Sequence, residues 1–323
     1  MFKIDYPFTK EILACGAQLE ANFCLTKKDA GFVTNNLGNL ALPNIYEQYQ
    51  CQVENTQKEL KIKPKIITHD LHPEFNSTKF AQAIQQKNKG LKRVPIQHQM
   101  AHLASCLAEN KLSEAVIGVV FDNAGVGTDG DIWGGEFFVG NLKNINRAAC
   151  LRFNQADSTE GVTSSAAVFF DRLAKCLSLR ERFDFEGQGL VELERIINRS
   201  SHVANKIYDY TPQKSKDMLV IVLDPIFAGI REDLEKDISK SIISAALHNT
   251  IIELTRDTCH KINQKEKLKK VVLTGTVFQS KTLLNRLKDL LTQDGLSVIE
   301  HRYFSCNDSN ISFGQAALAN QLC

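Results

Sequence analysis

The residues that most clearly suggest chemistry lie in one glycine-rich stretch, Asp122 to Glu136, which reads DNAGVGTDGDIWGGE. It follows the β-branched apolar run Ala115 to Phe121, which predicts a buried strand. Asp122 and Asp129 could hold a cation, and unshielded glycine N–H groups could approach a phosphate. The glycines concerned are Gly125, Gly127 and Gly130. The same stretch also predicts a β-hairpin, because Asp-Gly is a strong turn signal, so both interpretations stay open.

A second candidate site is the histidine pair His98 and His102 in the run Gln97 to Ser105. On a helix, a spacing of four residues places both imidazoles on one face, where they can bind one metal ion. The pair alone is also typical of an ordinary helix, so a metal site needs a third ligand. Asp308 lies between a predicted strand and a predicted helix, where it could be an N-cap or a ligand.

A third candidate is the segment Thr274 to Gln279, which follows a predicted strand and precedes a predicted helix. A strand, a glycine turn and a helix N-terminus together can bind an anion or a nucleotide. An ordinary tight connection between a strand and a helix has the same pattern.

Strand and helix signals alternate along the whole chain, which predicts an α/β protein. The predicted strands are 12–25, 30–34, 65–70, 91–96, 116–121, 135–140, 148–153, 219–223, 270–273 and 297–302. The predicted helices are 43–61, 77–88, 98–110, one from 163, 188–198, 239–262, 280–294 and 311–321. We expect Ser77 and Thr78 to cap the second of these helices, and residues 200–216 to form a loop with one short strand.

The composition is that of an ordinary globular protein. The 323 residues are 43% hydrophobic and 24% charged, with a net charge of +2, which gives no electrostatic argument for nucleic acid or membrane binding. No leader pattern and no membrane-length apolar run is present, so we expect a cytoplasmic protein without a membrane partner. The nine cysteines include no C-x-x-C pair, which argues against a disulfide framework or a zinc knuckle.

Seven short motifs follow one another in the order found in a known family. Together they resemble the C-terminal, TsaD-like region of the hydrogenase maturation carbamoyltransferase HypF, over nearly the whole chain. The motifs are DLHP at 70–73, QHQMAH at 97–102, DNAGVGTDGDIWGGE at 122–136, TSS at 163–165, FEGQ at 185–188, GTVFQS at 275–280 and NDSN at 307–310.

The resemblance implies an actin/sugar-kinase/Hsp70-like (ASKHA) α/β fold, with two lobes and a nucleotide cleft between them. We expect a first lobe over residues 1–112, with the C-terminal helix 311–323 packing back on it, and a second lobe over residues 113–310. The resemblance implies that His98, His102 and Asp308 bind a divalent metal, zinc or iron. It also implies nucleotide contacts, for ATP, AMP or carbamoyl-adenylate, from Asp122, Gly125, Gly127, Thr128, Asp129, Gly187, Gly275, Thr276 and Gln279.

The resemblance further implies that the chain passes a carbamoyl group from carbamoyl-adenylate to the C-terminal cysteine of a HypE-like acceptor, in nickel-iron hydrogenase maturation. The front half of the family, with its YrdC-like domain, has no counterpart in these residues. We therefore expect a separate YrdC-like source of carbamoyl-adenylate. No general base can be named from the sequence.

Several residues depart from the family pattern. Glu20 replaces a lysine, Thr276 replaces a glycine, and a stretch between about Phe153 and Thr163 is shortened. A β-branched residue does not easily adopt positive φ, so Thr276 suggests an altered approach to the nucleotide. These departures leave two alternatives open. One is a degenerate scaffold or regulator that binds metal or nucleotide without turnover. The other is a TsaD-like tRNA threonylcarbamoyltransferase, which the low net charge disfavours.

Overall fold

Two β-sheets organise the chain in the computed structural model, which describes residues 1–154, 162–197, 205–216 and 218–323. The first sheet has the order β1-β4-β3-β2-β5-β6. Its strands β1, β4, β3 and β2 pair antiparallel, and β5 and β6 continue the sheet parallel to β2. The strands are β1 Phe2–Asp5, β2 Ile12–Ala14, β3 Cys24–Lys27, β4 Ala30–Val33, β5 Ile66–Asp70 and β6 Lys92–Ile96.

The second sheet has the order β11-β12-β9-β8-β7-β13-β14, and β10 pairs with β9 outside this path. Its centre is an antiparallel meander of β7, β8 and β9, and β13 joins β7 in parallel. The strands are β7 Val116–Val126, β8 Ile132–Asn141, β9 Asn144–Asn154, β10 Val162–Thr163, β11 Thr211–Ser215, β12 Met218–Val222, β13 Lys270–Thr274 and β14 Ser297–Ile299.

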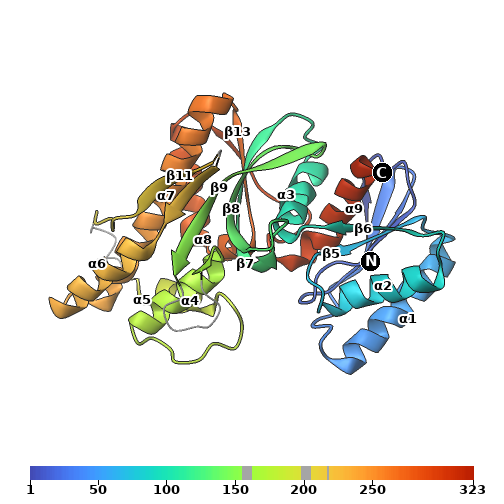
Figure 1. Ribbon diagram of the computed structural model, residues 1–323, viewed down its shortest axis with the longest axis horizontal. Helices are drawn as coiled ribbons and strands as arrows, with labels where there is room; N and C mark the ends of the chain where they lie inside the picture. The colour runs from blue at the N-terminus through green and yellow to red at the C-terminus, as the bar shows by residue number, and fades with distance from the viewer. Residues whose placement is uncertain (155–161, 198–204, 217) are drawn as a thin grey trace.

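The described helices pack on both sheets, and Figure 1 shows the two sheets side by side with α3 between them. The helices are α1 Pro43–Leu60, α2 Asn76–Lys87, α3 His98–Glu109, α4 Ala166–Cys176, α5 Gln188–Ile196, α6 Asp224–Glu235, α7 Lys240–Glu266, α8 Lys281–Gln293 and α9 Ile311–Leu322, with short 3-10 helices η2 Thr276–Gln279 and η3 Asp308–Asn310. In the part of the chain that the structure describes, none of these helices is both long and apolar enough to cross a membrane.

Alternation along the strands divides the first sheet between two apolar cores. Leu13 and Leu25 belong to a core with the side chains of α1 and α2, whereas Ala14 and Cys24 belong to a core with α3 and α9. Successive side chains of a strand point to opposite faces, so one sheet buries both surfaces. A third core lies between the second sheet and helices α4 to α8.

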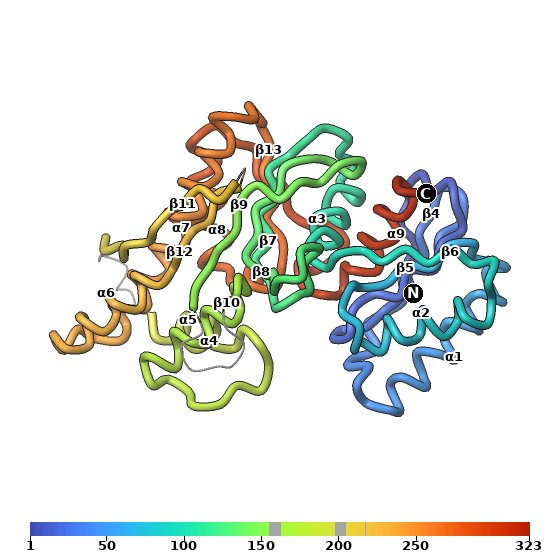
Figure 2. Tube along the Cα trace, in the orientation of Figure 1, coloured from blue at the N-terminus to red at the C-terminus, as the bar shows by residue number. Residues whose placement is uncertain are grey.

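Helices α3 and α9 lie side by side where the two sheets meet (Figure 2). A Cβ at Gly314 of α9 would come within 1.9 Å of the Ala101 carbonyl oxygen of α3, so only glycine permits this close approach. The other end of α9 is held by the connection between β1 and β2, because Asn320 Oδ1 accepts a hydrogen bond of 3.0 Å from Thr9 N. The lobe boundary at residue 112 stays a prediction.

Most predicted elements are confirmed within a few residues, but two predictions were wrong and some elements were missed. The predicted strand 12–25 is two strands separated by residues 15–23, where Gly16 has φ +72°. Ser77 and Thr78 lie inside α2 and do not cap it, because that helix begins one residue earlier, at Asn76. Strand β1 and helix α6 were not predicted. The shortened stretch near 153–163 lies mostly outside the described residues.

Candidate functional site

Four buried side chains converge where α3 meets the second sheet: His98, His102, Asp122 and Asp308. The two histidines occupy neighbouring turns of α3, Asp122 lies on β7, and Asp308 begins η3. Their nearest donor atoms all lie within 4.8 Å of one another. Three segments distant in sequence therefore bring two imidazoles and two carboxylates to one point.

Both imidazoles direct Nε2 at the carboxylates. His98 Nε2 lies 3.3 Å from Asp122 Oδ2 and 3.4 Å from Asp308 Oδ1. The corresponding distances from His102 Nε2 are 3.0 Å and 3.7 Å. Among the described residues, Asp308 Oδ1 has no hydrogen-bond partner. The donor atoms thus face a common centre rather than pairing off completely.

Asp70 fixes the orientation of His98. Its Oδ2 lies 2.6 Å from His98 Nδ1, and its Oδ1 accepts a hydrogen bond from His72 N. Because His98 Nδ1–H donates to Asp70, the Nε2 of a neutral ring carries a lone pair, which then faces two carboxylate oxygens. Lone pairs and carboxylates repel one another unless a cation, either a proton or a metal ion, lies between them.

The charges of the cluster shift its pKa values in opposite directions. Burial alone would raise the pKa of Asp122, but His102 and His98 outweigh it and hold that pKa well below its usual range. Burial alone would lower the pKa of His98, but Asp308 and Asp70 outweigh it and raise that pKa well above its usual value. The cluster therefore favours bound positive charge.

This donor set fits a divalent transition metal. Zinc and iron accept imidazole nitrogens together with carboxylate oxygens, and a carboxylate that orients a ligand imidazole is a common feature of such sites. The sequence-predicted trio His98, His102 and Asp308 is brought together. Asp122, predicted to contact nucleotide, also turns its carboxylate into this cluster. Asp70 was missed, although its position at the end of a buried strand was a signal.

The turn after β13 is bound to the same cluster. Thr276 N donates a hydrogen bond of 2.9 Å to Asp122 Oδ1. Gly275 has φ +101°, and a Cβ there would lie 2.3 Å from the Phe121 carbonyl oxygen, so this position requires glycine. Thr276 itself begins η2, a right-handed 3-10 helix that a β-branched residue can enter. The substitution of glycine by threonine therefore causes no left-handed strain.

The predicted hairpin is confirmed, and its polar groups bind one another. Strands β7 and β8 pair antiparallel, with a register shift between Phe121 and Gly125. Gly127 N donates a hydrogen bond of 2.8 Å to the Asp131 carbonyl. Asp129 accepts from Trp133 Nε1 at 2.8 Å and from Arg147 at 3.0 Å. The nucleotide contacts predicted for Gly125, Gly127, Thr128 and Asp129 stay a prediction.

The end of the glycine-rich stretch is held by a buried ion pair. Glu136 is fully buried, and its Oε2 accepts a hydrogen bond of 2.6 Å from Arg147 Nε. Its Oε1 accepts from Ser164 Oγ at 2.9 Å and from Gly134 N at 3.1 Å. The Arg147 guanidinium also lies 4.1 Å from the ring centre of Trp133. The WGGE motif therefore stabilises the hairpin.

A cavity of about 120 Å³ lies between α5 and the turn after β13. It brings together three residues predicted to contact nucleotide, namely Gly187, Thr276 and Gln279. Glu186, on its wall, accepts hydrogen bonds from Ala124 N at 2.7 Å and Ser165 Oγ at 2.9 Å. Burial raises the pKa of the Glu186 carboxyl to about 7.

Glu20 lies beside the cluster of His98, His102, Asp122 and Asp308. Burial, together with the negative charges of Asp308 and Asp122, raises the pKa of its carboxyl, and the Asp308 backbone N–H donates to it. Its φ of +47° is unusual for a residue with a side chain. This residue adds a further carboxylate close to the cluster.

Two family models match the chain. The HypF Kae1-like domain matches residues 8–109. The second subdomain of the Kae1-like carbamoyltransferase domain matches residues 118–156 and 153–315. The two models together cover nearly all of the chain and meet within the segment from α3 to β7.

Curated relatives and a crystal structure agree with these matches. The chain is 26% identical to Carbamoyltransferase HypF2 of Cupriavidus necator over 96% of its own length, and spans about half (46%) of that relative. It is also 26% identical to a Carbamoyltransferase HypF homolog of the same organism, covering 95% of this chain and 91% of that one. The crystal structure of full-length HypF in the phosphate- and nucleotide-bound form superposes with a TM-score of 0.89 and 32% identity, over 99% of this chain and 56% of that one. The predicted two-lobed, actin-like α/β fold is confirmed.

Proposed function

The chain belongs to the HypF family of carbamoyltransferases, and from that premise we propose that it transfers a carbamoyl group from carbamoyl-adenylate to an acceptor thiol. We take the acceptor to be the C-terminal cysteine of a HypE-like protein, and the context to be nickel-iron hydrogenase maturation. The source of carbamoyl-adenylate is a separate YrdC-like protein, and the reaction takes place in the cytoplasm.

The convergence of His98, His102, Asp122 and Asp308 is the observation that carries this proposal. These four residues would hold the metal, which would polarise the carbamoyl carbonyl as a Lewis acid. Asp70 holds the His98 ring so that Nε2 faces the centre. Thr276 N holds Asp122 in the same way from the side of the nucleotide turn. The protein thus preorganises the site before the substrate binds.

We place the adenosine part of the substrate in the cavity lined by Gly187, Thr276 and Gln279. Phe185, 54% exposed, lies on its wall and offers a ring on which a base can stack. Because Thr276 N binds Asp122, this cavity and the metal cluster share one turn of the backbone. The reactive carbonyl of a bound adenylate would then lie on the metal side of that turn.

A direct transfer assay tests this function. The metal-loaded chain is supplied with carbamoyl-adenylate, generated from labelled carbamoyl phosphate and ATP by a YrdC-like enzyme, and with a peptide that ends in cysteine. We expect label in the peptide, none when serine replaces the cysteine, and none with His102→Ala. A control measures whether the labelled carbamoyl-adenylate is intact. If it is intact and the wild-type chain transfers no label to the peptide, the proposal is contradicted.

A second candidate is a degenerate scaffold or regulator that binds metal or nucleotide without turnover. The observation in its favour is that several backbone N–H groups of the glycine turns already have partners within the protein, at Gly127, Gly275 and Thr276. Calorimetric titration with AMP separates the two candidates in part. Metal binding without saturable AMP binding would favour the scaffold, and AMP binding together with transfer would exclude it.

A further inference from the structure

A second cluster of metal-binding side chains lies at the opposite end of α3 from the histidine pair. It consists of Cys106, Glu109 and His301, whose donor atoms all lie within 4.8 Å of one another. Cys106 and Glu109 are buried, and only about 4% of the His301 side chain is exposed. We propose that this cluster binds a second divalent cation of the zinc class, through Cys106 Sγ, Glu109 Oε1 and His301 Nδ1.

The spacing along α3 supports this site. His98, His102, Cys106 and Glu109 follow one another at intervals of four, four and three residues, which keeps them on one face of the helix. Cys106 lies eight residues from His98, or roughly 12 Å along the helix axis. One face of α3 therefore carries two pairs of donors, His98 with His102 and Cys106 with Glu109. A cation at the second pair would not contact a cation at the first.

The opposing segment completes both clusters in the same way. The segment from residue 300 to Asp308, the first residue of η3, supplies His301 to the second cluster and Asp308 to the first. Each cluster thus contains two donors from α3 and one from this segment, and the first cluster also contains Asp122 of β7. The second cluster has its own ligand set and shares none with the first.

The His301 ring is already oriented as a ligand. Its Nδ1 is hydrogen-bonded to Glu109 Oε1, and its Nε2 lies 2.8 Å from Thr274 Oγ1. A ligand imidazole normally donates its other N–H to an oxygen, which here would be Thr274 Oγ1. Glu109 Oε2 accepts from Tyr303 N at 2.8 Å, so the carboxylate is also held. A metal ion would replace the proton between Nδ1 and Oε1 and also the proton of the Cys106 thiol, and both protons would be released to water.

The chemistry of the donors suits zinc in particular. Thiolate, imidazole and carboxylate are its usual protein ligands, and three protein ligands leave a position for water. The charges of one thiolate and one carboxylate balance a divalent cation, which matters because an unbalanced charge is costly in a buried site. The ligand set differs from the first cluster by its sulfur, so the two sites are distinguishable by spectroscopy.

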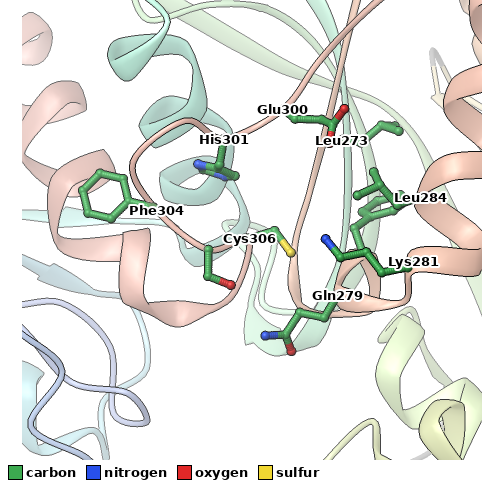
Figure 3. A pocket seen from close by; sticks show the side chains of 10 residues that line it. Leu273, Gln279, Lys281, Leu284, Glu300, His301, Phe304 and Cys306 are labelled. Carbon is green, nitrogen blue, oxygen red and sulfur yellow. The ribbon is translucent and has the colours of Figure 1, made fainter.

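A cavity gives access to the second cluster. His301 lies on the wall of a cavity of about 340 Å³, between α8 and the segment after β14 (Figure 3). Lys281, Glu300 and Cys306 line the same cavity, so its wall is partly polar. Water and a hydrated cation can therefore reach His301 without unfolding of α3.

Cobalt substitution and metal counting test the proposal on the full chain. Co²⁺ bound by a thiolate gives a near-ultraviolet charge-transfer band, which the sulfur-free first cluster cannot give. We expect this band in the wild type and in His102→Ala, and its loss in Cys106→Ser. Cys51→Ser, which removes an exposed cysteine of α1, is the matched control and should keep the band.

The bound-metal stoichiometry gives a second readout that does not depend on transferase activity. We expect about two zinc ions per wild-type chain, and about one in each of Cys106→Ser, His301→Gln and His102→Ala. The proposal is overturned if the wild type binds one zinc ion, His102→Ala binds none, and the cobalt-loaded wild type shows no charge-transfer band. That result would leave a proton between Glu109 and His301, and it would leave the first cluster intact.

Discussion

The cluster of His98, His102, Asp122 and Asp308 and the glycine hairpin both contain acidic residues close to glycine turns, but their polar groups differ in how completely they are hydrogen-bonded. In the hairpin, Asp129 and Glu136 are bound on both oxygens by partners within the protein. In the cluster, Asp308 Oδ1 and two Nε2 atoms face one another without a complete set of hydrogen bonds. The first arrangement stabilises the fold, and the second is suited to binding a ligand.

This difference shows which residues carry function. A buried polar group without a partner costs free energy, so a group of such atoms that face one centre suggests that a ligand binds there. By this criterion Asp129 and Glu136 of the hairpin contribute to the structure, whereas Asp122 contributes to the cluster. Asp122 is the point where the two regions meet, because its carboxylate belongs to the cluster and its backbone belongs to β7.

The largest expected effect separates the two regions directly. His102→Ala should abolish metal binding at the first cluster and leave the protein folded, because it removes a ligand from a helix that the apolar cores still hold. Metal analysis and circular dichroism measure the two outcomes. His260→Ala, which removes a half-exposed histidine of α7, is the matched control and should keep the metal. Loss of the folded state in His102→Ala would show that this histidine is structural.

The opposite result is expected in the hairpin. Arg147→Met leaves the buried Glu136 carboxylate without its cation and should lower the free energy of unfolding by about 3–5 kcal/mol. Urea denaturation measures this loss, with the exposed Arg195→Met as the control. Metal affinity should not change. If Arg147→Met keeps the stability of the wild type but loses the metal, the distinction between a structural hairpin and a ligand-binding cluster is contradicted.

Glu186 should make stability depend on pH. Its pKa is raised from 4.5 to about 7 by burial, so the folded state binds the proton more tightly than the unfolded state. Its contribution to stability is complete below about pH 4.5 and is lost as the pH rises through about 7, up to about 3 kcal/mol in all. Denaturation of the wild type and of Glu186→Gln between these pH values measures it. If the free energy of unfolding changes equally steeply with pH in the wild type and in Glu186→Gln, the raised pKa of the Glu186 carboxyl is contradicted.

A smaller effect is expected from Asp70→Asn. The amide keeps the shape of the side chain but removes the charge that orients His98, so metal affinity at the first cluster should fall about 10-fold to 100-fold. Competition with a chelator measures this change. Because Asp70 does not itself contact the common centre, metal should still bind at saturating concentration. No change in affinity would mean that His98 needs no orienting partner.

Local sequence features predicted the elements but not the contacts between them. The helix predicted over 98–110 is confirmed as α3, His98–Glu109, whereas its N-cap, in which Gln97 accepts a hydrogen bond from Met100 N, was not predicted. The hairpin follows from its turn. By contrast, residues 15–23 were predicted as part of one strand, and only the fold shows that they form a connection beside α9, where Gly16 N donates a hydrogen bond to Gln315 Oε1.

The candidate site could be predicted only where a family motif carried it. The spacing of four residues indicates His98 and His102 as a possible ligand pair. Asp308 lies more than two hundred residues away along the chain, and the packing of α9 on α3 brings it to the two histidines. Asp70 lies in the DLHP motif but was not assigned to the site, and the cluster of Cys106, Glu109 and His301 had no motif. Their partners are set by tertiary structure, which spacing along the chain does not contain.

The most direct test of the central claim is X-ray anomalous scattering at the absorption edge of the bound metal, from crystals of the chain grown with zinc. The account predicts a peak bounded by His98 Nε2, His102 Nε2 and the Asp122 and Asp308 carboxylates, and loss of that peak in His102→Ala. An ordered, folded crystal with zinc present and no peak at this position would contradict it.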